Sequence, residues 1–284
     1  MTDAATGPNA AMHTNWNTAS APVWIAQQAV LDQQLGPLGD EAMAALGPKS
    51  GETIIDVGCG CGTTSRQLAR LVGPSGHVLA LDISAPMLQV ASEQARAEAL
   101  NQITCQAADA QIHPFEPASA DGIFSRFGVM FFIDPPAAFA NLRLALKRGG
   151  RLAFVCWKDD NWINMPMRAV TAAIPEAPPL PAPVPGAPGP MAFQDPARVR
   201  DILQASGFAD IGVREFHKAT GVGTMEETLP IVLDIGPLGR ALRERPDWRE
   251  PAIAALGEAF APYVEEDGQV RLTSGVWIVT ATNP

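Results

Sequence analysis

The stretch Ile54-Ile55-Asp56-Val57-Gly58-Cys59-Gly60-Cys61-Gly62 decides the fold of this chain. It sets an apolar strand before a turn with three glycines, and the next residues, Gly62 to Leu71, predict a helix. Glycine adopts positive φ without a Cβ clash and lets the main chain approach a ligand closely. The unpaired amides of a first helical turn bind carboxylate or phosphate. The sequence therefore predicts a strand, loop and helix that together bind an anionic group.

The spacing of the glycines distinguishes between ligands. A dinucleotide-binding turn reads Gly-x-Gly-x-x-Gly. Here the third glycine comes two residues after the second, and Asp56 stands two residues before the first. This pattern, Asp-x-Gly-x-Gly-x-Gly, resembles the first motif of the class I S-adenosylmethionine-dependent methyltransferases. The resemblance implies that the loop holds the methionine part of that cofactor.

Two acidic residues follow later strands at the intervals of this family. A second apolar strand, His77 to Leu81, ends in Asp82, and a third, Gln102 to Gln106, leads to Asp109. The resemblance implies that Asp82 accepts both ribose hydroxyls and that Asp109 lies beside the exocyclic amine of adenine. Asp82 could instead cap the next helix, but Ser84 fills that role at least as well.

Later segments match two further motifs of the family. A fourth strand runs over residues 121–128, and Gly149 and Gly150 form a turn into a fifth strand within 146–155. The segments 81–84 and 146–152 resemble the ubiquinone/menaquinone-biosynthesis-type branch, which commonly has Pro where Arg148 stands. The cofactor contacts implied by the resemblance are Asp56, Gly58, Cys59, Gly60, Gly62, Thr63, Asp82, Ile83, Met87, Asp109, Ala110, Ser125, Arg126 and Phe127.

No catalytic residue can be assigned from the sequence. Methyl transfer from a sulfonium needs a general base only if the acceptor must lose a proton. His113, His217 and Tyr263 are candidates, although each residue type is more often structural. The segment 134–136 is similar to an amino-methyltransferase motif, but Ala137 replaces its aromatic residue, and Asp134 as a helix N-cap explains it better.

Composition limits the partners. The chain has 284 residues, 47% of them hydrophobic, and a formal net charge of −10. This charge disfavours nucleic acid or an anionic membrane as substrate, because both require basic surfaces. The sequence has no apolar run long enough to cross a bilayer, and residues 1–17 lack a signal-peptide pattern, so we expect a cytoplasmic protein. The four cysteines fit a reduced compartment and lack zinc-site spacing, and no metal site is expected.

Alternating strands and helices predict an α/β fold. The family resemblance implies a Rossmann-like, seven-stranded mixed sheet in the order 3-2-1-4-5-7-6, with the last strand antiparallel and helices on both faces. The predicted division is an N-terminal helical cap (1–46), an S-adenosylmethionine-binding core (47–160), a Pro-rich loop and helix of the substrate side (161–206), and the last two strands with a helical lid insertion (207–284).

Several later segments have specific predictions. Residues 175–190 hold eight prolines in sixteen positions and predict an extended loop. Asp195 and Pro196 start a helix that Gly207 ends. Strands are expected over 211–217 and 275–280, with a helical region over 225–263. The run 157–162 could offer oxygen ligands to magnesium, but a polar turn is the default. Trp157, Trp162, Met130, Phe131 and Phe132 could line an apolar acceptor pocket, or belong to the core.

The predicted activity is methyl transfer from S-adenosyl-L-methionine to a small-molecule acceptor, on oxygen or carbon of an apolar or aromatic metabolite. One alternative is a protein that binds the cofactor without transferring methyl. A nicotinamide-dependent oxidoreductase is a further alternative, which the glycine spacing and Asp109 argue against. A homodimer is possible. The acceptor remains open at this stage, because the resemblance describes the cofactor half of the chain.

Overall fold

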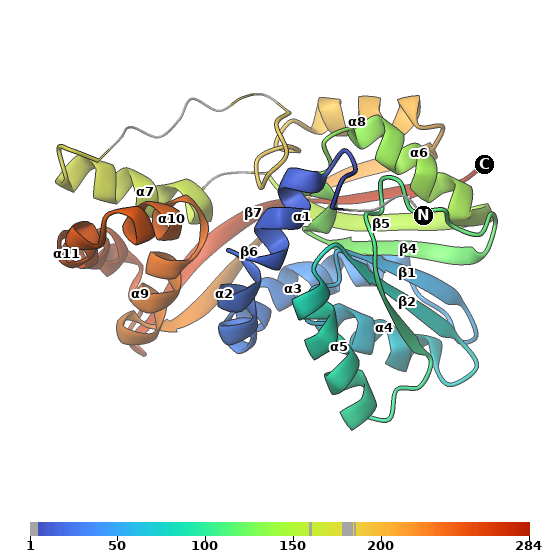
Figure 1. Ribbon diagram of the computed structural model, residues 1–284, viewed down its shortest axis with the longest axis horizontal. Helices are drawn as coiled ribbons and strands as arrows, with labels where there is room; N and C mark the ends of the chain where they lie inside the picture. The colour runs from blue at the N-terminus through green and yellow to red at the C-terminus, as the bar shows by residue number, and fades with distance from the viewer. Residues whose placement is uncertain (1–4, 159–160, 178–183, 185) are drawn as a thin grey trace.

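The computed structural model describes residues 5–158, 161–177, 184 and 186–284. In this part of the chain, seven strands form one sheet (Figure 1). The strands are β1 (Thr53–Val57), β2 (His77–Asp82), β3 (Ile103–Ala107), β4 (Ala120–Arg126), β5 (Leu146–Trp157), β6 (Ala209–Thr224) and β7 (Gln269–Thr282).

The order of the strands is β3-β2-β1-β4-β5-β7-β6. The pairs from β3 to β5 are parallel, whereas β7 runs antiparallel to both β5 and β6. The predicted Rossmann-like order, with an antiparallel last strand between the fifth and sixth, is confirmed. Parallel strands bring their carboxyl ends to one edge, so the loops after β1, β2, β3 and β4 lie together.

Helices cover both faces of the sheet (Figure 1). Polar contacts join α3 to α4, and α6 packs against α8 on the opposite face. The α-helices are α1 (Ala10–Asn17), α2 (Ala21–Ala26), α3 (Gln28–Leu46), α4 (Thr63–Val72), α5 (Ala85–Ala97), α6 (Pro135–Ala145), α7 (Asn161–Ala173), α8 (Pro196–Ala205), α9 (Met225–Asp234), α10 (Gly236–Glu244) and α11 (Arg249–Phe260). Short 3₁₀ turns lie at Gly128–Phe131, Pro246–Trp248 and Ala261–Tyr263.

The predicted caps are confirmed, whereas several predicted bounds were wrong. Ser84, Asp134 and Asp195 cap α5, α6 and α8 with their side chains. The last two strands are much longer than predicted, and β4 ends at Arg126 because a 3₁₀ turn begins at Gly128. The helical region before β1 breaks at Gln27 into α2 and α3. The described residues of the Pro-rich loop form no helix or strand; positions 178–183 and 185 lie outside the described residues.

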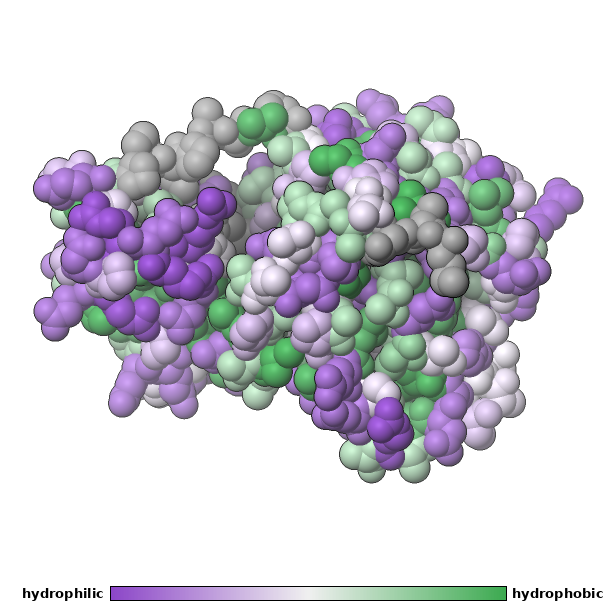
Figure 2. Space-filling model, viewed as in Figure 1, coloured by the Kyte–Doolittle hydropathy of each residue, from purple (hydrophilic) through white to green (hydrophobic). Residues whose placement is uncertain are grey.

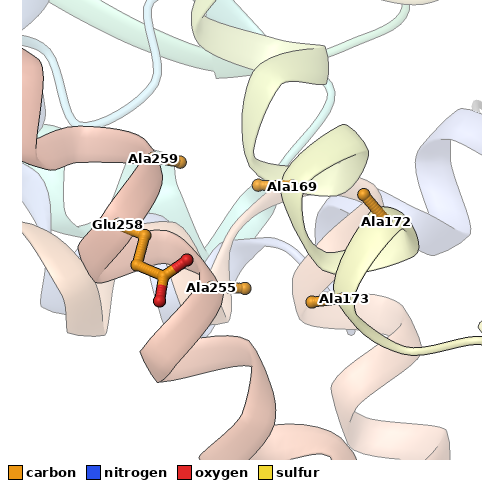
Figure 3. Close-up of a pocket in the computed structure, with 6 residues that line it drawn as sticks. All are labelled: Ala169, Ala172, Ala173, Ala255, Glu258 and Ala259. Carbon is orange, nitrogen blue, oxygen red and sulfur yellow. The ribbon is translucent and has the colours of Figure 1, made fainter.

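The described residues form two large hydrophobic cores and two small clusters, around Met87 and around Leu88. The main core lies between the sheet and the helices α3, α4, α6 and α8. The second core joins α7, α9, α10 and α11, here called the helical unit, to the first part of β7 through Val270 and Leu272. Within the unit, the alanine-rich sides of α7 and α11 face each other across a depression of about 440 Å³ (Figure 3). The outer face around α10 and α11 is mainly hydrophilic (Figure 2).

The two cores do not follow the predicted division of the chain into four segments. α7 packs in the second core, whereas α8 packs in the main one, although the sequence placed both in 161–206. The four-segment division therefore stays a prediction. Among the described residues, we find no helix with both the length and the apolar character needed to span a bilayer.

Candidate functional site

The glycine loop after β1 is shaped by three close backbone approaches. Gly58, Gly60 and Gly62 all have positive φ, at 71°, 56° and 81°. A Cβ on Gly58 would lie 2.7 Å from Cα of Gly128, and one on Gly62 would lie 2.7 Å from Cβ of Ala91. At such distances a side chain at either position would fit only if the neighbouring atoms moved. Gly58 thus lets the loop pack on the turn after β4, and Gly62 lets α4 begin against α5.

Asp56 is fully buried at the end of β1. Its Oδ2 accepts hydrogen bonds from the hydroxyls of Thr64 (2.7 Å) and Ser65 (2.6 Å), which fixes the first turn of α4. Its Oδ1 is buried without a partner in the described structure. Burial raises the pKa of Asp56 to about 6, although the two hydroxyls and Arg126 act against this rise. In this geometry the carboxyl group holds the loop in shape.

Asp82 joins the glycine loop to the end of β2. Its Oδ2 accepts the backbone N–H of Gly60 at 2.8 Å, and its Oδ1 accepts that of Ser84 at 2.8 Å. Burial raises its pKa, and these backbone hydrogen bonds oppose the rise. The helix cap on α5 comes from Ser84, so Asp82 is not the N-cap. Each carboxylate oxygen has a further lone pair for a ligand hydroxyl.

Asp109 is buried in the loop after β3 and already has a partner from the N-terminus. The side-chain amide of Asn9 donates to both its oxygens, at 2.9 Å each, and the backbone N–H of Gln111 donates to Oδ1 at 2.9 Å. Asn9 also accepts the backbone N–H of Ile133 at 3.0 Å. One amide thus connects the loops after β3 and β4, at the position where the resemblance expects an adenine amine.

The N-terminal helices α1 and α2, here called the N-terminal cover, lie over the same edge of the sheet (Figure 1). Asn17 donates to the carbonyl of Ile83 and accepts the N–H of Ala85. Trp16 and Trp24 meet edge to face at 5.5 Å, and both pack on Cys61 and Met87. The cover therefore contacts the loops that carry the predicted cofactor contacts.

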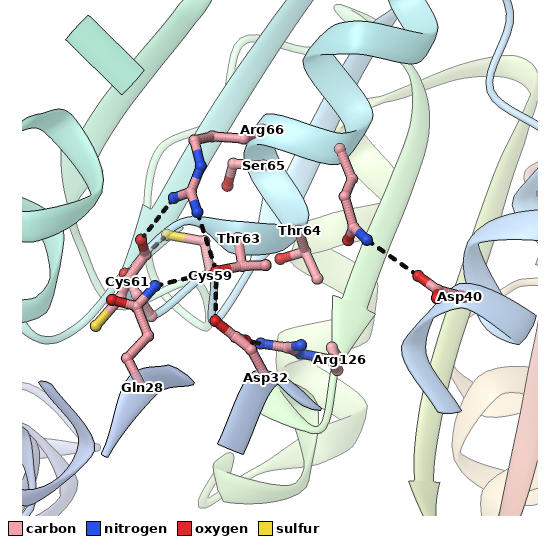
Figure 4. Close-up of polar contacts among 12 residues, drawn as sticks. Gln28, Asp32, Asp40, Cys59, Cys61, Thr63, Thr64, Ser65, Arg66 and Arg126 are labelled. Atoms are coloured by element: carbon pink, nitrogen blue, oxygen red, sulfur yellow. Dashed lines mark hydrogen bonds and ion pairs between the residues drawn. The ribbon is translucent and has the colours of Figure 1, made fainter. Parts of the chain in front are cut away.

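α3 also contacts the glycine loop, through charged and polar side chains (Figure 4). Asp32 accepts the hydroxyl of Thr63 at 2.7 Å and pairs with the guanidinium of Arg126 at 2.7 Å. Gln28 donates to Thr63 at 3.1 Å. Ser125, the residue before Arg126, is fully buried, and its hydroxyl bonds the carbonyl of Val57 and the N–H of Gly128.

Aromatic side chains lie beyond the ends of β4 and β5. Phe127 stacks on Trp157 with ring centres 4.4 Å apart, and it holds a φ of 63°, which is strained for a residue with a side chain. Phe131 meets Trp16 edge to face at 5.3 Å. Met130 and Phe132 are buried in the main core, and the side chain of Trp162 is outside the described residues.

Comparison with known proteins agrees with this geometry. Residues 54–150, about a third of the chain, match the family model described as "Methyltransferase domain". This segment is a class I methyltransferase domain. It contains the glycine loop, Asp82, Asp109 and the end of β4, which the fold brings to one edge.

Two relatives and one solved structure illustrate the similarity. Nocamycin O-methyltransferase of Saccharothrix syringae is 29% identical over 64% of this chain and 67% of its own length. The ubiquinone/menaquinone biosynthesis C-methyltransferase UbiE of Hahella chejuensis is 35% identical over 37% of this chain and 43% of its own. The structure of phosphoethanolamine N-methyltransferase 2 of Haemonchus contortus with S-adenosyl-L-methionine has a TM-score of 0.51 at 20% identity, covering 92% of this chain and 53% of that one.

The methyltransferase domain fits the cofactor of its superfamily. At Gly60 an added Cβ would lie 3.0 Å from Cε of Met87, so the bare glycine lets the end of the Met87 side chain lie against the main chain of the loop. Cys59 and Cys61 stand on either side of Gly60 in the chain as neutral thiols, because burial raises the pKa of Cys59 well above its usual range and that of Cys61 to about 11. Ile83 and Ala110 lie in the loops after β2 and β3. Contact of these residues with a ligand stays a prediction.

The candidate bases lie on different elements. His113 follows Asp109 in its loop and packs on Phe115, and partial burial lowers its pKa. His217, on β6, contacts Glu215, which also binds Lys158. Tyr263 is exposed in a 3₁₀ turn after α11. The acids Asp159 and Asp160 of the alternative magnesium site lie outside the described residues, and elsewhere in the described chain no cluster of potential metal ligands forms.

Three residues of this site were not predicted from the sequence. Asn9, Asn17 and Asp32 each bond to residues at least 31 positions away in the chain. The only available signal was the helical pattern before β1, which indicated a cap but gave no partner for its polar side chains.

Proposed function

We propose that this chain transfers the methyl group of S-adenosyl-L-methionine to a small-molecule acceptor, on oxygen or carbon. The observation that carries the proposal is the carboxylate of Asp82, held at the end of β2 by the N–H of Gly60. This contact fixes the glycine loop and a ribose-binding acid in one geometry. The relatives named above support the reaction class; the matches cover only 67% and 43% of their own lengths.

The sulfonium of the cofactor supplies an activated methyl group, and the protein contributes position. The glycine loop would offer its main chain to the methionine part of the cofactor, Asp82 would hold the ribose, and Asp109 would accept the adenine amine while still bound by Asn9. The N-terminal cover would exclude water from this edge. Because displacement at the methyl carbon is in line, fixing the cofactor against the acceptor supplies much of the rate enhancement.

The acceptor is proposed to be apolar or aromatic. Phe127, Trp157 and Phe131 place flat rings beside the ends of β4 and β5, where the methyl group would point. Rings of this kind favour flat, apolar ligands. The formal charge of −10 argues against nucleic acid as acceptor. A cytoplasmic location and a homodimer are further parts of the proposal.

Calorimetric titration with S-adenosyl-L-methionine and S-adenosylhomocysteine tests the cofactor. Micromolar binding of both is expected, and a single-turnover screen of labelled methyl transfer to phenols, quinones, amines and thiols then identifies the acceptor class. Binding without transfer to any acceptor would favour a cofactor-binding protein. Binding of a nicotinamide nucleotide in place of both ligands would favour an oxidoreductase.

Asp82→Ala tests the site itself. Loss of two ribose hydrogen bonds to a charged group is expected to weaken S-adenosylhomocysteine binding by about a hundredfold. Thermal unfolding is measured alongside, because the variant also loses the acceptor for the backbone N–H groups of Gly60 and Ser84. Asp195→Ala is the matched control, because Asp195 also accepts a backbone N–H but caps α8. Unchanged affinity in Asp82→Ala would remove the ribose assignment.

A further inference from the structure

The pair of Asp32 and Arg126 stands where the amino-acid end of the proposed cofactor would lie. Arg126 is the last residue of β4, and Asp32 lies on α3. The side chain of Asp32 is 21% exposed and that of Arg126 is 15% exposed. Oδ1 of Asp32 lies 2.7 Å from Nη2 of Arg126. The other oxygen of Asp32 accepts the hydroxyl of Thr63, the first residue of α4 after the glycine loop (Figure 4).

Space for the pair is built into α3. At Gly39 an added Cβ would lie 2.8 Å from Cδ of Arg126, so any larger residue would displace the arginine. The aliphatic part of the Arg126 side chain therefore passes α3 at Gly39. The missing side chain at Gly39 thus leaves room for the arginine on its way to Asp32.

The pair is not needed to attach α3. Leu38, Ala42 and Leu46 bury the helix in the main core, and Glu41 pairs with Arg214 on β6 further along. A mostly buried ion pair gains little net stability, because desolvation of the two charges offsets their attraction. The charges of Asp32 and Arg126 therefore call for an explanation other than attachment of the helix.

The amino-acid end of S-adenosylmethionine is a zwitterion with an ammonium and a carboxylate group. An ion pair on the protein is complementary to this zwitterion. The carboxylate of the pair can bind the ammonium group of the ligand, and the guanidinium can bind its carboxylate. The first turn of α4 also favours a carboxylate, because its N-cap Gly62 provides no side-chain acceptor for the free amides. Asp32 connects the two, because one of its oxygens accepts the hydroxyl of Thr63 in this turn and the other accepts the guanidinium of Arg126.

We infer that Asp32 and Arg126 form a specificity-determining pair that reads the zwitterionic end of the cofactor, Asp32 binding its ammonium group and Arg126 its carboxylate. This inference rests on the proposed function. Asp32 then has a binding role, and the contact of α3 with the glycine loop changes when the amino-acid end of the ligand binds. A nucleoside without that end leaves the pair closed on itself.

Three ligands separate the two roles. S-adenosylhomocysteine carries both charges, its decarboxylated amine carries only the ammonium group, and 5′-methylthioadenosine carries neither. Asp32→Asn is expected to weaken the first two by about ten- to a hundredfold and to leave the third unchanged. Arg126→Gln should weaken S-adenosylhomocysteine by a similar factor and leave the other two unchanged. Dissociation constants are measured by calorimetry, with thermal unfolding of every variant alongside.

Glu41→Gln is the matched control, because it removes an ion pair between the same helix and the sheet outside the site. It should leave all three dissociation constants unchanged. Equal loss of all three ligands in Asp32→Asn, or loss of none, overturns the inference, as does wild-type protein that binds 5′-methylthioadenosine as tightly as S-adenosylhomocysteine. Wild-type protein that binds none of the three instead overturns the proposed function.

Discussion

Asp56 is a buried acid in the loop that also carries the site, and its burial predicts a pH effect on stability. The pKa of Asp56 rises from 3.8 to about 6 on folding. Between these values the folded state binds more protons than the unfolded state, so stability falls as pH rises through this window. Asp56→Asn keeps the acceptor for Thr64 and Ser65 but cannot ionise.

Urea unfolding of both proteins at about pH 4.5 and pH 7 measures the effect. The wild type should lose about 2 kcal/mol relative to Asp56→Asn over this range. The comparison with the variant removes the contributions of all other titrating groups that do not contact Asp56. A constant difference between the two proteins would mean that Asp56 is ionised with an ordinary pKa in the folded state.

At the scale of single residues, the sequence predicts the site only where a motif fixes the spacing. The glycines, Asp82 and Asp109 follow their strands directly, so predicting the strands was enough to place them. Asn9 and Asp32 carry no such signal, because their partners Asp109 and Arg126 are about a hundred residues away in the chain. Only folding of the N-terminal helices onto the sheet brings them to this edge.

The meeting of α4 with α5 depends on Gly62, and a substitution there can be corrected in the partner helix. A methyl group at position 62 would lie 2.7 Å from Cβ of Ala91, at a φ of 81°. Gly62→Ala is therefore expected to lower the free energy of unfolding by about 1–3 kcal/mol more than Gly149→Ala. Gly149 has a similar φ of 75°, but no atom lies within 4 Å of its added Cβ.

The double variant Gly62→Ala/Ala91→Gly tests the cause. Removing the methyl group of Ala91 removes the 2.7 Å contact and leaves Cα of residue 91 at 3.1 Å, although glycine inside α5 costs about 1 kcal/mol by itself. The two changes should thus be less destabilising together than the sum of their separate effects, measured by urea unfolding. Strict additivity would place the strain in the backbone of the loop and not in the contact between the helices.

At the scale of elements, the sequence predicts the order of strands better than their ends. The last two strands were predicted over 211–217 and 275–280, but they extend over 209–224 and 269–282. Glycines 221 and 223 follow the predicted strand, and glycine disfavours a strand by local preference. Pairing of β6 with β7 continues past them to Thr224 and Gln269, because cross-strand hydrogen bonds and the second core stabilise an antiparallel pair that local preference does not.

The two large hydrophobic cores of the described chain share one strand. Val270 and Leu272 of β7 pack in the helical unit, while Val276, Ile278 and Val279 of the same strand pack in the main core. The glycine loop packs through Cys59 and Cys61 in two smaller clusters beside the main core, and none of its residues packs in the second core. Damage to the helical unit should therefore leave the cofactor edge formed.

Leu256→Ala and Leu142→Ala compare the cores, because both leucines are fully buried, in α11 and α6 respectively. Each truncation should cost about 2–5 kcal/mol in the core that contains it. Leu256→Ala is expected to accelerate amide hydrogen exchange in α7, α9, α10 and α11 while S-adenosylhomocysteine still binds with nearly wild-type affinity. Leu142→Ala should accelerate exchange throughout the sheet, because α6 packs on the core that the strands share. Equal acceleration across the whole chain in Leu256→Ala would show a single cooperative unit.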